Sequence, residues 1–100
     1  MRIAEIIGCV TLSRTHPCLK GTRWLIGVPC SLAALTKSER GDGEDLVIYD
    51  ALGAGVGSLV GFSEGGEAAA PFYPEKKPID AYAACILENV HLTSAEVGRK

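Results

Sequence analysis

The sequence predicts a small all-β domain. Short apolar runs recur along the chain, and glycine, proline or charged residues separate them, which is typical of strands joined by turns. A chain of 100 residues is long enough for one domain. Such a domain buries roughly 65% of the surface that its unfolded chain exposes. This leaves one core with little margin, so self-association would stabilise the fold.

The N-terminal part is expected to form two strands. Residues 2–14 are apolar on both faces apart from Glu5, which is typical of a strand covered by the core on one side and by a neighbouring chain or loop on the other. A second strand is expected over 24–28, because Pro29 has no amide hydrogen with which to continue a ladder. The segment 31–35 is compatible with a single helical turn.

Loops and strands alternate in the middle of the chain. Residues 36–45 are charged and glycine-bearing and have no apolar side chain, so we expect a mobile, exposed loop. Two further strands are expected at 46–49 and 59–62. The connection 65–78 contains three prolines, which restrict a helix to one turn over 67–70.

The segment Asp50 to Ser58, with the sequence DALGAGVGS, is the most distinctive of the chain. Glycines at alternate positions after an apolar run are how a dinucleotide-binding fingerprint begins. That fingerprint must open a helix whose N-terminus meets the pyrophosphate, whereas here a second apolar run follows. We therefore expect a strand-turn-strand in which glycine provides a positive φ or close backbone approach.

Residues 79–90 fit two patterns. One set of apolar residues follows helical spacing: Ile79, Tyr82, Ala83, Ile86, Leu87 and Val90. The same segment also fits a strand with two apolar faces. Pattern alone slightly favours the helix, and Pro78 followed by Asp80 would be a reasonable helix start.

Composition argues against several kinds of partner and location. A formal net charge of −2 provides no electrostatic attraction for nucleic acid or anionic lipid. The longest apolar stretch is far below the ~20 residues that span a bilayer. Glu5 falls where a signal peptide would continue its apolar region, so we expect a cytoplasmic protein.

The four cysteines show no pair at the two-residue spacing of zinc ribbons or thioredoxin-like motifs. In a cytoplasmic chain they are expected to be reduced thiols, with Cys9, Cys30 and Cys85 acting as small core side chains. His16 and Cys18 together supply only two soft ligands, which do not make a tetrahedral site. No metal or other cofactor is expected.

Catalytic machinery is not expected either. His16 lies in a proline turn and His91 near the C-terminus, so no Ser-His-Asp arrangement is supported. Asp50, at the end of a strand, is the one carboxylate suited to acid–base work, but the sequence offers it no partner. Its expected role is to accept hydrogen bonds from the amides of the following turn.

The order of these segments resembles the EutN/CcmL family of pentameric shell proteins, which form the vertices of bacterial microcompartments, over nearly the whole chain. The matching segments are Ile7 to Val10 leading into Ser13-Arg14, Leu19-Lys20-Gly21 before Trp24 to Val28, Tyr49 to Gly57, and Pro78 to Ala81. The most specific of them is Asp50, which is separated by two residues from the sequence Gly-Ala-Gly-x-Gly.

This resemblance implies a five-stranded OB-like β-barrel with one or two short helical turns. It makes residues 80–88 a strand, and it implies one domain over 1–90 with a C-terminal tail over 91–100. Three positions depart from the family pattern: Ser58 replaces a common acidic residue, Glu88 replaces a frequent aspartate, and 65–69 contains no arginine. These departures bear on any intersubunit ion pair and not on the fold.

The resemblance also implies a structural function rather than an enzymatic one. Flat hexagonal tiles cannot close a polyhedron, and a tapering pentamer supplies the curvature where five tiles meet. Such a ring closes if each heterologous contact rotates the next subunit by about 72°. We expect a homopentamer in the microcompartment shell, with hexameric or trimeric shell proteins as partners. Candidate subunit-contact or axial-pore residues are Glu5, Asp50, Gly53, Ala54 and Gly55.

An OB-like barrel also suggests an alternative function, the binding of single-stranded nucleic acid through aromatic and basic side chains on one face. The aromatic residues are few, and the ten lysines and arginines are spread along the chain. We therefore expect no nucleic acid and no membrane among the partners.

Overall fold

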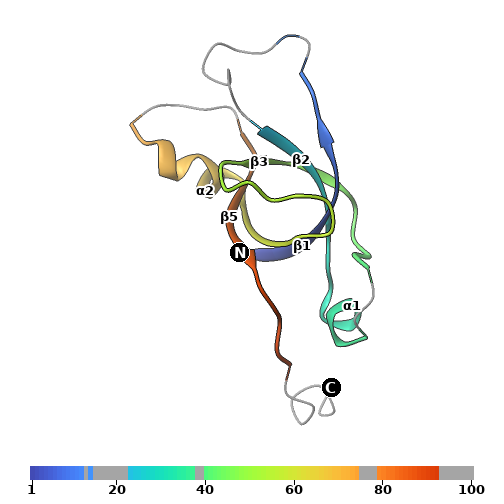
Figure 1. Cartoon of the computed structure of the whole chain (residues 1–100). Coiled ribbons are helices and arrows are strands. Elements are labelled where there is room, and N and C mark those ends of the chain that lie inside the picture. The colour runs from blue at the N-terminus through green and yellow to red at the C-terminus, as the bar shows by residue number, and fades with distance from the viewer. Residues whose placement is uncertain (13, 15–22, 38–39, 75–78, 93–100) are drawn as a thin grey trace.

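The computed structural model describes residues 1–12, 14, 23–37, 40–74 and 79–92, and it is built around a closed five-stranded barrel (Figure 1). The strands are β1 (Arg2–Val10), β2 (Arg23–Pro29), β3 (Leu46–Asp50), β4 (Leu59–Glu64) and β5 (Ala81–Leu87). Their order around the barrel is β1-β2-β3-β5-β4, and β4 closes against β1. Only the β3–β5 contact is parallel among the described strand pairs. The expected five-stranded OB-like barrel is confirmed.

The core fills the inside of the barrel with one face of each strand. Its buried members are Ala4, Ile6, Leu25, Ile48, Ala54, Val60, Phe62, Ala81 and Ala83. Full burial of each large side chain contributes about 1.5–3 kcal/mol. Gly27 leaves room for one of these side chains, because a Cβ there would lie 2.6 Å from the Cδ1 of Ile48 and that side chain would have to shift.

The first strand is shorter than the sequence predicted. The strand ends at Val10, whereas the sequence predicted a strand as far as residue 14. Its pairing with β2 shifts register between Ile6 and Gly8. This irregularity leaves Ile7 40% exposed, and Cys9 is also exposed. The second apolar side of β1 is therefore only partly covered within one chain.

Residues 81–87 form a strand, as the family resemblance implied, and the helical alternative is wrong. β5 pairs antiparallel with β4 from Leu59 opposite Leu87 to Glu64 opposite Ala81. A strand satisfies the backbone edge of β4, which a helix would leave unpaired. The helical spacing of the apolar residues arises because both faces of β5 carry apolar side chains.

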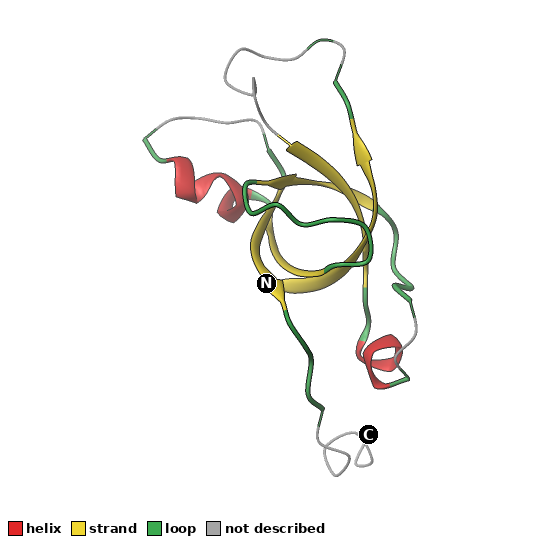
Figure 2. Cartoon of the chain, in the orientation of Figure 1, coloured by secondary structure: helices red, strands yellow, loops and turns green. Residues whose placement is uncertain are grey.

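Both expected helical turns are present and lie outside the ring of strands (Figure 2). Helix α1 (Leu32–Thr36) begins after Ser31, whose hydroxyl oxygen accepts a hydrogen bond from the amide of Ala34 at 3.1 Å. Helix α2 (Gly66–Ala69) continues into the 3-10 turn η2 (Ala70–Phe72). Pro71 permits this continuation because it lies at the start of the turn.

A second apolar cluster lies between α2 and the barrel. Its buried members are Tyr49, Ala68 and Ile79, with Trp24, Ala69, Phe72 and Tyr82 packed against them. The Tyr49 ring centroid lies 5.2 to 5.7 Å from those of Trp24, Phe72 and Tyr82. These aromatic side chains therefore pack against one another and attach α2 to the barrel.

The loop before β3 is exposed, as predicted, but it is anchored to the barrel end. The amides of Asp42 and Gly43 donate to the carbonyl of Pro29 at 3.1 and 2.9 Å. The Asp42 carboxylate accepts from the Ser31 amide at 2.8 Å and from the Ser31 hydroxyl at 2.5 Å. Residues 40–43, here named the strap, are thus attached to the end of β2 and the start of α1.

The prediction that Cys9, Cys30 and Cys85 lie in the core is wrong. Cys9 is exposed and Cys30 and Cys85 are only half-buried, so none of the three belongs to the core cluster. All three are free thiols. Partial burial raises the pKa of Cys30, and the nearby Glu5 and Asp42 charges raise it further. The pair His16 and Cys18 lies outside the described residues.

Candidate functional site

The loop 51–58 joins β3 to β4 and lies across one end of the barrel (Figure 2). The Ala54 side chain points inward and joins the core, with 1% of the residue exposed. Gly53 and Gly55 on either side of it are exposed. The loop therefore closes this end of the core with one methyl group and presents glycine backbone to the outside.

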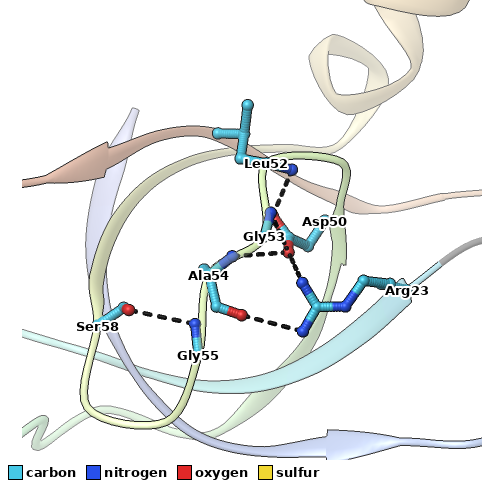
Figure 3. A network of polar contacts seen from close by, with 7 residues as sticks. All are labelled: Arg23, Asp50, Leu52, Gly53, Ala54, Gly55 and Ser58. Atoms are coloured by element: carbon cyan, nitrogen blue, oxygen red, sulfur yellow. Dashed lines mark hydrogen bonds and ion pairs between the residues drawn. The ribbon is translucent and has the colours of Figure 1, made fainter.

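The Asp50 side chain fixes the conformation of the loop by accepting hydrogen bonds from its backbone amides (Figure 3). Its side chain is 0% exposed. One carboxylate oxygen, Oδ1, accepts from the amide of Leu52 at 2.9 Å. The other, Oδ2, accepts from the amides of Gly53 and Ala54, each at 3.0 Å. The role expected for Asp50, acceptor for turn amides, is confirmed.

Arg23, the first residue of β2, completes this network. Its guanidinium donates to Asp50 Oδ2 at 2.9 Å and to the carbonyl oxygen of Ala54 at 3.1 Å. Arg23 was not among the site residues predicted from the sequence. The signal that could have found it is strand register, because antiparallel pairing of β2 with β3 places Arg23 opposite Asp50.

The second half of the loop is closed by Ser58 and by β1. The Ser58 hydroxyl accepts from the Gly55 amide at 3.2 Å, and the Ser58 amide donates to the Gly55 carbonyl at 2.9 Å. Ile6 of β1 donates to the Ser58 carbonyl and accepts from the Gly57 amide. Ser58, which stands where the resemblance led us to expect an acidic residue, thus tightens the turn within its own chain.

These contacts exclude a phosphate cradle at this loop. An anion-binding nest needs several backbone amides that point outward together. Here the amides of Leu52, Gly53, Ala54, Gly55, Gly57 and Ser58 all donate to groups of the same chain. The chain then enters β4 rather than a helix. The rejection of a dinucleotide fingerprint is confirmed.

The structure brings four of the five candidate residues together and leaves Glu5 apart from their network. Glu5 lies on β1, where its Oε1 is 3.7 Å from Nε of Arg40 and accepts from the Gly41 amide at 3.2 Å. It therefore anchors the strap within its own chain. Among the described residues, no three His, Cys, Asp or Glu side chains group as metal ligands would, and no helix in that part of the chain could cross a membrane.

The five strands define a small all-β barrel fold, and solved structures of small shell proteins are similar to this chain. GrpN from Rhodospirillum rubrum, described as a pentameric microcompartment shell protein, is 27% identical, with a TM-score of 0.77, over 93% of this chain and 100% of its own. CcmL of Gloeobacter violaceus is 28% identical, with a TM-score of 0.79, over 92% of this chain and 90% of its own.

A model of one protein family also matches the chain over residues 1–88; it is described as ethanolamine utilisation protein EutN/carboxysome. The chain belongs to this EutN/CcmL family, and the resemblance read from the sequence is confirmed. Comparison with curated protein sequences gives no match.

Proposed function

We propose that this protein forms homopentamers that occupy the vertices of a bacterial microcompartment shell. The observation that carries this proposal is its similarity to GrpN over the whole of that chain, because GrpN is itself described as a pentameric shell protein. Hexameric or trimeric shell proteins are the proposed partners, and the role is structural rather than catalytic. Asp50, the one carboxylate suited to acid–base work, has both oxygens engaged by its own loop.

The outer side of the 51–58 loop is the proposed contact between subunits or the lining of the ring axis. A Cβ built on Gly55 would meet nothing within 4 Å inside the subunit. Contacts within one chain therefore do not require glycine at position 55, whereas the close approach of a neighbouring backbone would require it. Val56 beside it is 74% exposed and Leu52 is 47% exposed, which supplies apolar surface for a neighbour to cover.

The mass of the assembly tests the proposal. Light scattering after size-exclusion chromatography should give about five times the 10.5 kDa chain mass. Gly55→Val should shift the protein to smaller species while its circular dichroism stays unchanged, because the open space around Gly55 leaves the subunit fold intact. Ala33→Val, at an exposed position of α1, is the control that should remain pentameric. A wild-type monomer or an even-numbered assembly would refute the ring.

Asp50 and Glu5 act differently in this proposal. Asp50 is buried and shapes the contact loop without touching a neighbour. Glu5 is proposed to face an arginine of the adjacent subunit in addition to its strap contacts. Glu5→Gln should then reduce the fraction of assembled rings at low protein concentration. Rings that resist dilution as well as the wild type would remove Glu5 from the interface.

The nucleic-acid alternative is not supported. Trp24, Tyr49, Phe72 and Tyr82 pack against one another beneath α2 instead of forming an open stacking face. Single-strand binding requires bases to stack on exposed aromatic rings beside basic side chains.

A further inference from the structure

Two adjoining cavities of about 460 and 350 Å³ lie outside the barrel where β3 begins and β4 ends. They share the lining residues Leu46 and Glu64, and the pair is here named the β3 groove. Its lining includes Glu44, Asp45, Leu46, Val47, Glu64 and Asp80. None of them belongs to the 51–58 loop.

The floor of the groove includes an open strand edge. On one side, β3 pairs with β2 along its whole length, from Leu46 opposite Gly27 to Asp50 opposite Arg23. On the other side the register with β5 contains one pair, Tyr49 opposite Tyr82. Leu46 and Val47 thus have no strand partner on the β5 side among the described strands. Val47 is also 47% exposed.

The rim of the groove is acidic. Glu44 and Asp45, just before β3, line one of the two cavities, and Asp80, just before β5, lines the other. No described lysine or arginine lies within ion-pair distance of these three carboxylates. The one cation in the lining, Arg2, is paired with Glu64 at 2.9 Å. A cationic occupant is therefore favoured electrostatically.

An extended peptide matches both features. An added strand obtains affinity from backbone hydrogen bonds to a free edge and specificity from alternate side chains. Successive side chains of a strand alternate in direction and rise about 3.3 Å per residue, so every second side chain lies on one side. We propose that the β3 groove binds an extended segment of a partner protein that carries Lys or Arg at alternate positions, paired with the edge of β3 at Leu46 and Val47.

Binding of a fluorescein-labelled peptide with the sequence KVKVK to the full chain tests this inference. Fluorescence anisotropy should rise to saturation as protein is added, whereas the charge-reversed peptide EVEVE should give no rise. The double variant Asp45→Asn/Asp80→Asn should weaken binding about fivefold, as expected for two exposed ion pairs. The matched control Glu67→Gln/Glu88→Gln removes two exposed charges outside the groove and should bind as tightly as wild type.

A second peptide separates strand pairing from charge attraction alone. N-methylation of every backbone amide in KVKVK preserves the charge but removes the amide donors on both edges of the peptide strand, and it should abolish saturable binding. Equal binding of the methylated peptide, or equal weakening by the two double variants, would overturn the proposal, as would no binding of KVKVK. Failure of peptide binding can be distinguished from failure of the pentamer proposal, because light scattering on the same samples measures the mass of the assembly separately.

Discussion

At the scale of single residues, the shape of the contact loop depends on Asp50. A buried carboxylate without partners would be strongly destabilising. Here three backbone amides and the Arg23 guanidinium surround it. The Asp50 carboxylate at the end of β3 therefore fixes the geometry of the 51–58 loop.

Asp50→Asn should lower the free energy of unfolding by about 2–4 kcal/mol, because an amide cannot accept on both sides and leaves buried donors unsatisfied. Urea unfolding at one fixed protein concentration measures the loss, since assembly also contributes to apparent stability. Asp45→Asn, an exposed aspartate before β3, should change stability by less than about 0.5 kcal/mol. Comparable losses in both variants would contradict the role given to the Asp50 network.

Two loop glycines differ in backbone conformation and should respond differently to alanine. Gly57 has a φ of +92°, while neither glycine has any atom within 4 Å of a built Cβ. Gly57→Ala should cost about 1–2 kcal/mol of subunit stability through backbone strain alone. Gly55→Ala should leave the stability of the subunit almost unchanged. Thermal unfolding measures both effects on the dissociated subunit. Gly57→Ala is compared with its parent in the Gly55→Val background, in which assembly is weakened. Gly55→Ala is compared with the wild type at a protein concentration low enough to dissociate the ring.

At the scale of elements, the strap and α1 form one polar unit. Ser31 caps α1 through its hydroxyl oxygen, and the same hydroxyl donates to Asp42. Gly41 fits against β2 so closely that a Cβ there would lie 2.4 Å from the Val28 carbonyl oxygen. The charged segment is thus held by backbone and capping contacts rather than by apolar burial.

This unit should depend on pH. Hydrogen bonds from the Ser31 hydroxyl and then from the Ser31 amide lower the pKa of Asp42 in the folded chain. A lowered pKa means that the stabilisation is present above the unfolded pKa and is lost as pH falls through the folded value. The Cα chemical shift of Ala34 should therefore move toward its non-helical value on acidification. Asp42→Asn should remove that transition, and an unchanged transition would assign it to another group.

At the scale of the whole molecule, assembly should cover what one chain leaves open. Ile7 and Cys9 of β1 remain exposed in the subunit. If a neighbouring chain covers this part of β1, maleimide labelling of Cys9, followed by peptide mass spectrometry, should be at least tenfold slower in the wild-type ring than in Gly55→Val. Equal labelling rates in ring and dissociated subunit would place the interface elsewhere.

Much of the fold could be predicted from local chemistry. Pro29 ends β2 and Ser31 caps α1, because each acts within a few residues of itself. The one helical turn expected over 67–70 is longer in the structure, because Pro71 lies at the start of η2 and lets the helical segment continue to Phe72. The role of Asp50 follows for the same reason, since its acceptors reach amides two to four residues ahead.

Other features were decided only when distant strands met. Whether 81–87 became a helix or a strand depended on the free edge of β4, which the apolar pattern of the segment does not contain. Arg23 joined Asp50 only through the register of β2 with β3. Cys9 is exposed although its register partner Leu25 belongs to the core, because it lies next to the end of β1. The sequence alone determined the turns, caps and strand boundaries that depend on near neighbours; the tertiary structure decided pairing, burial and the β3 groove, because these depend on which segments come together in space.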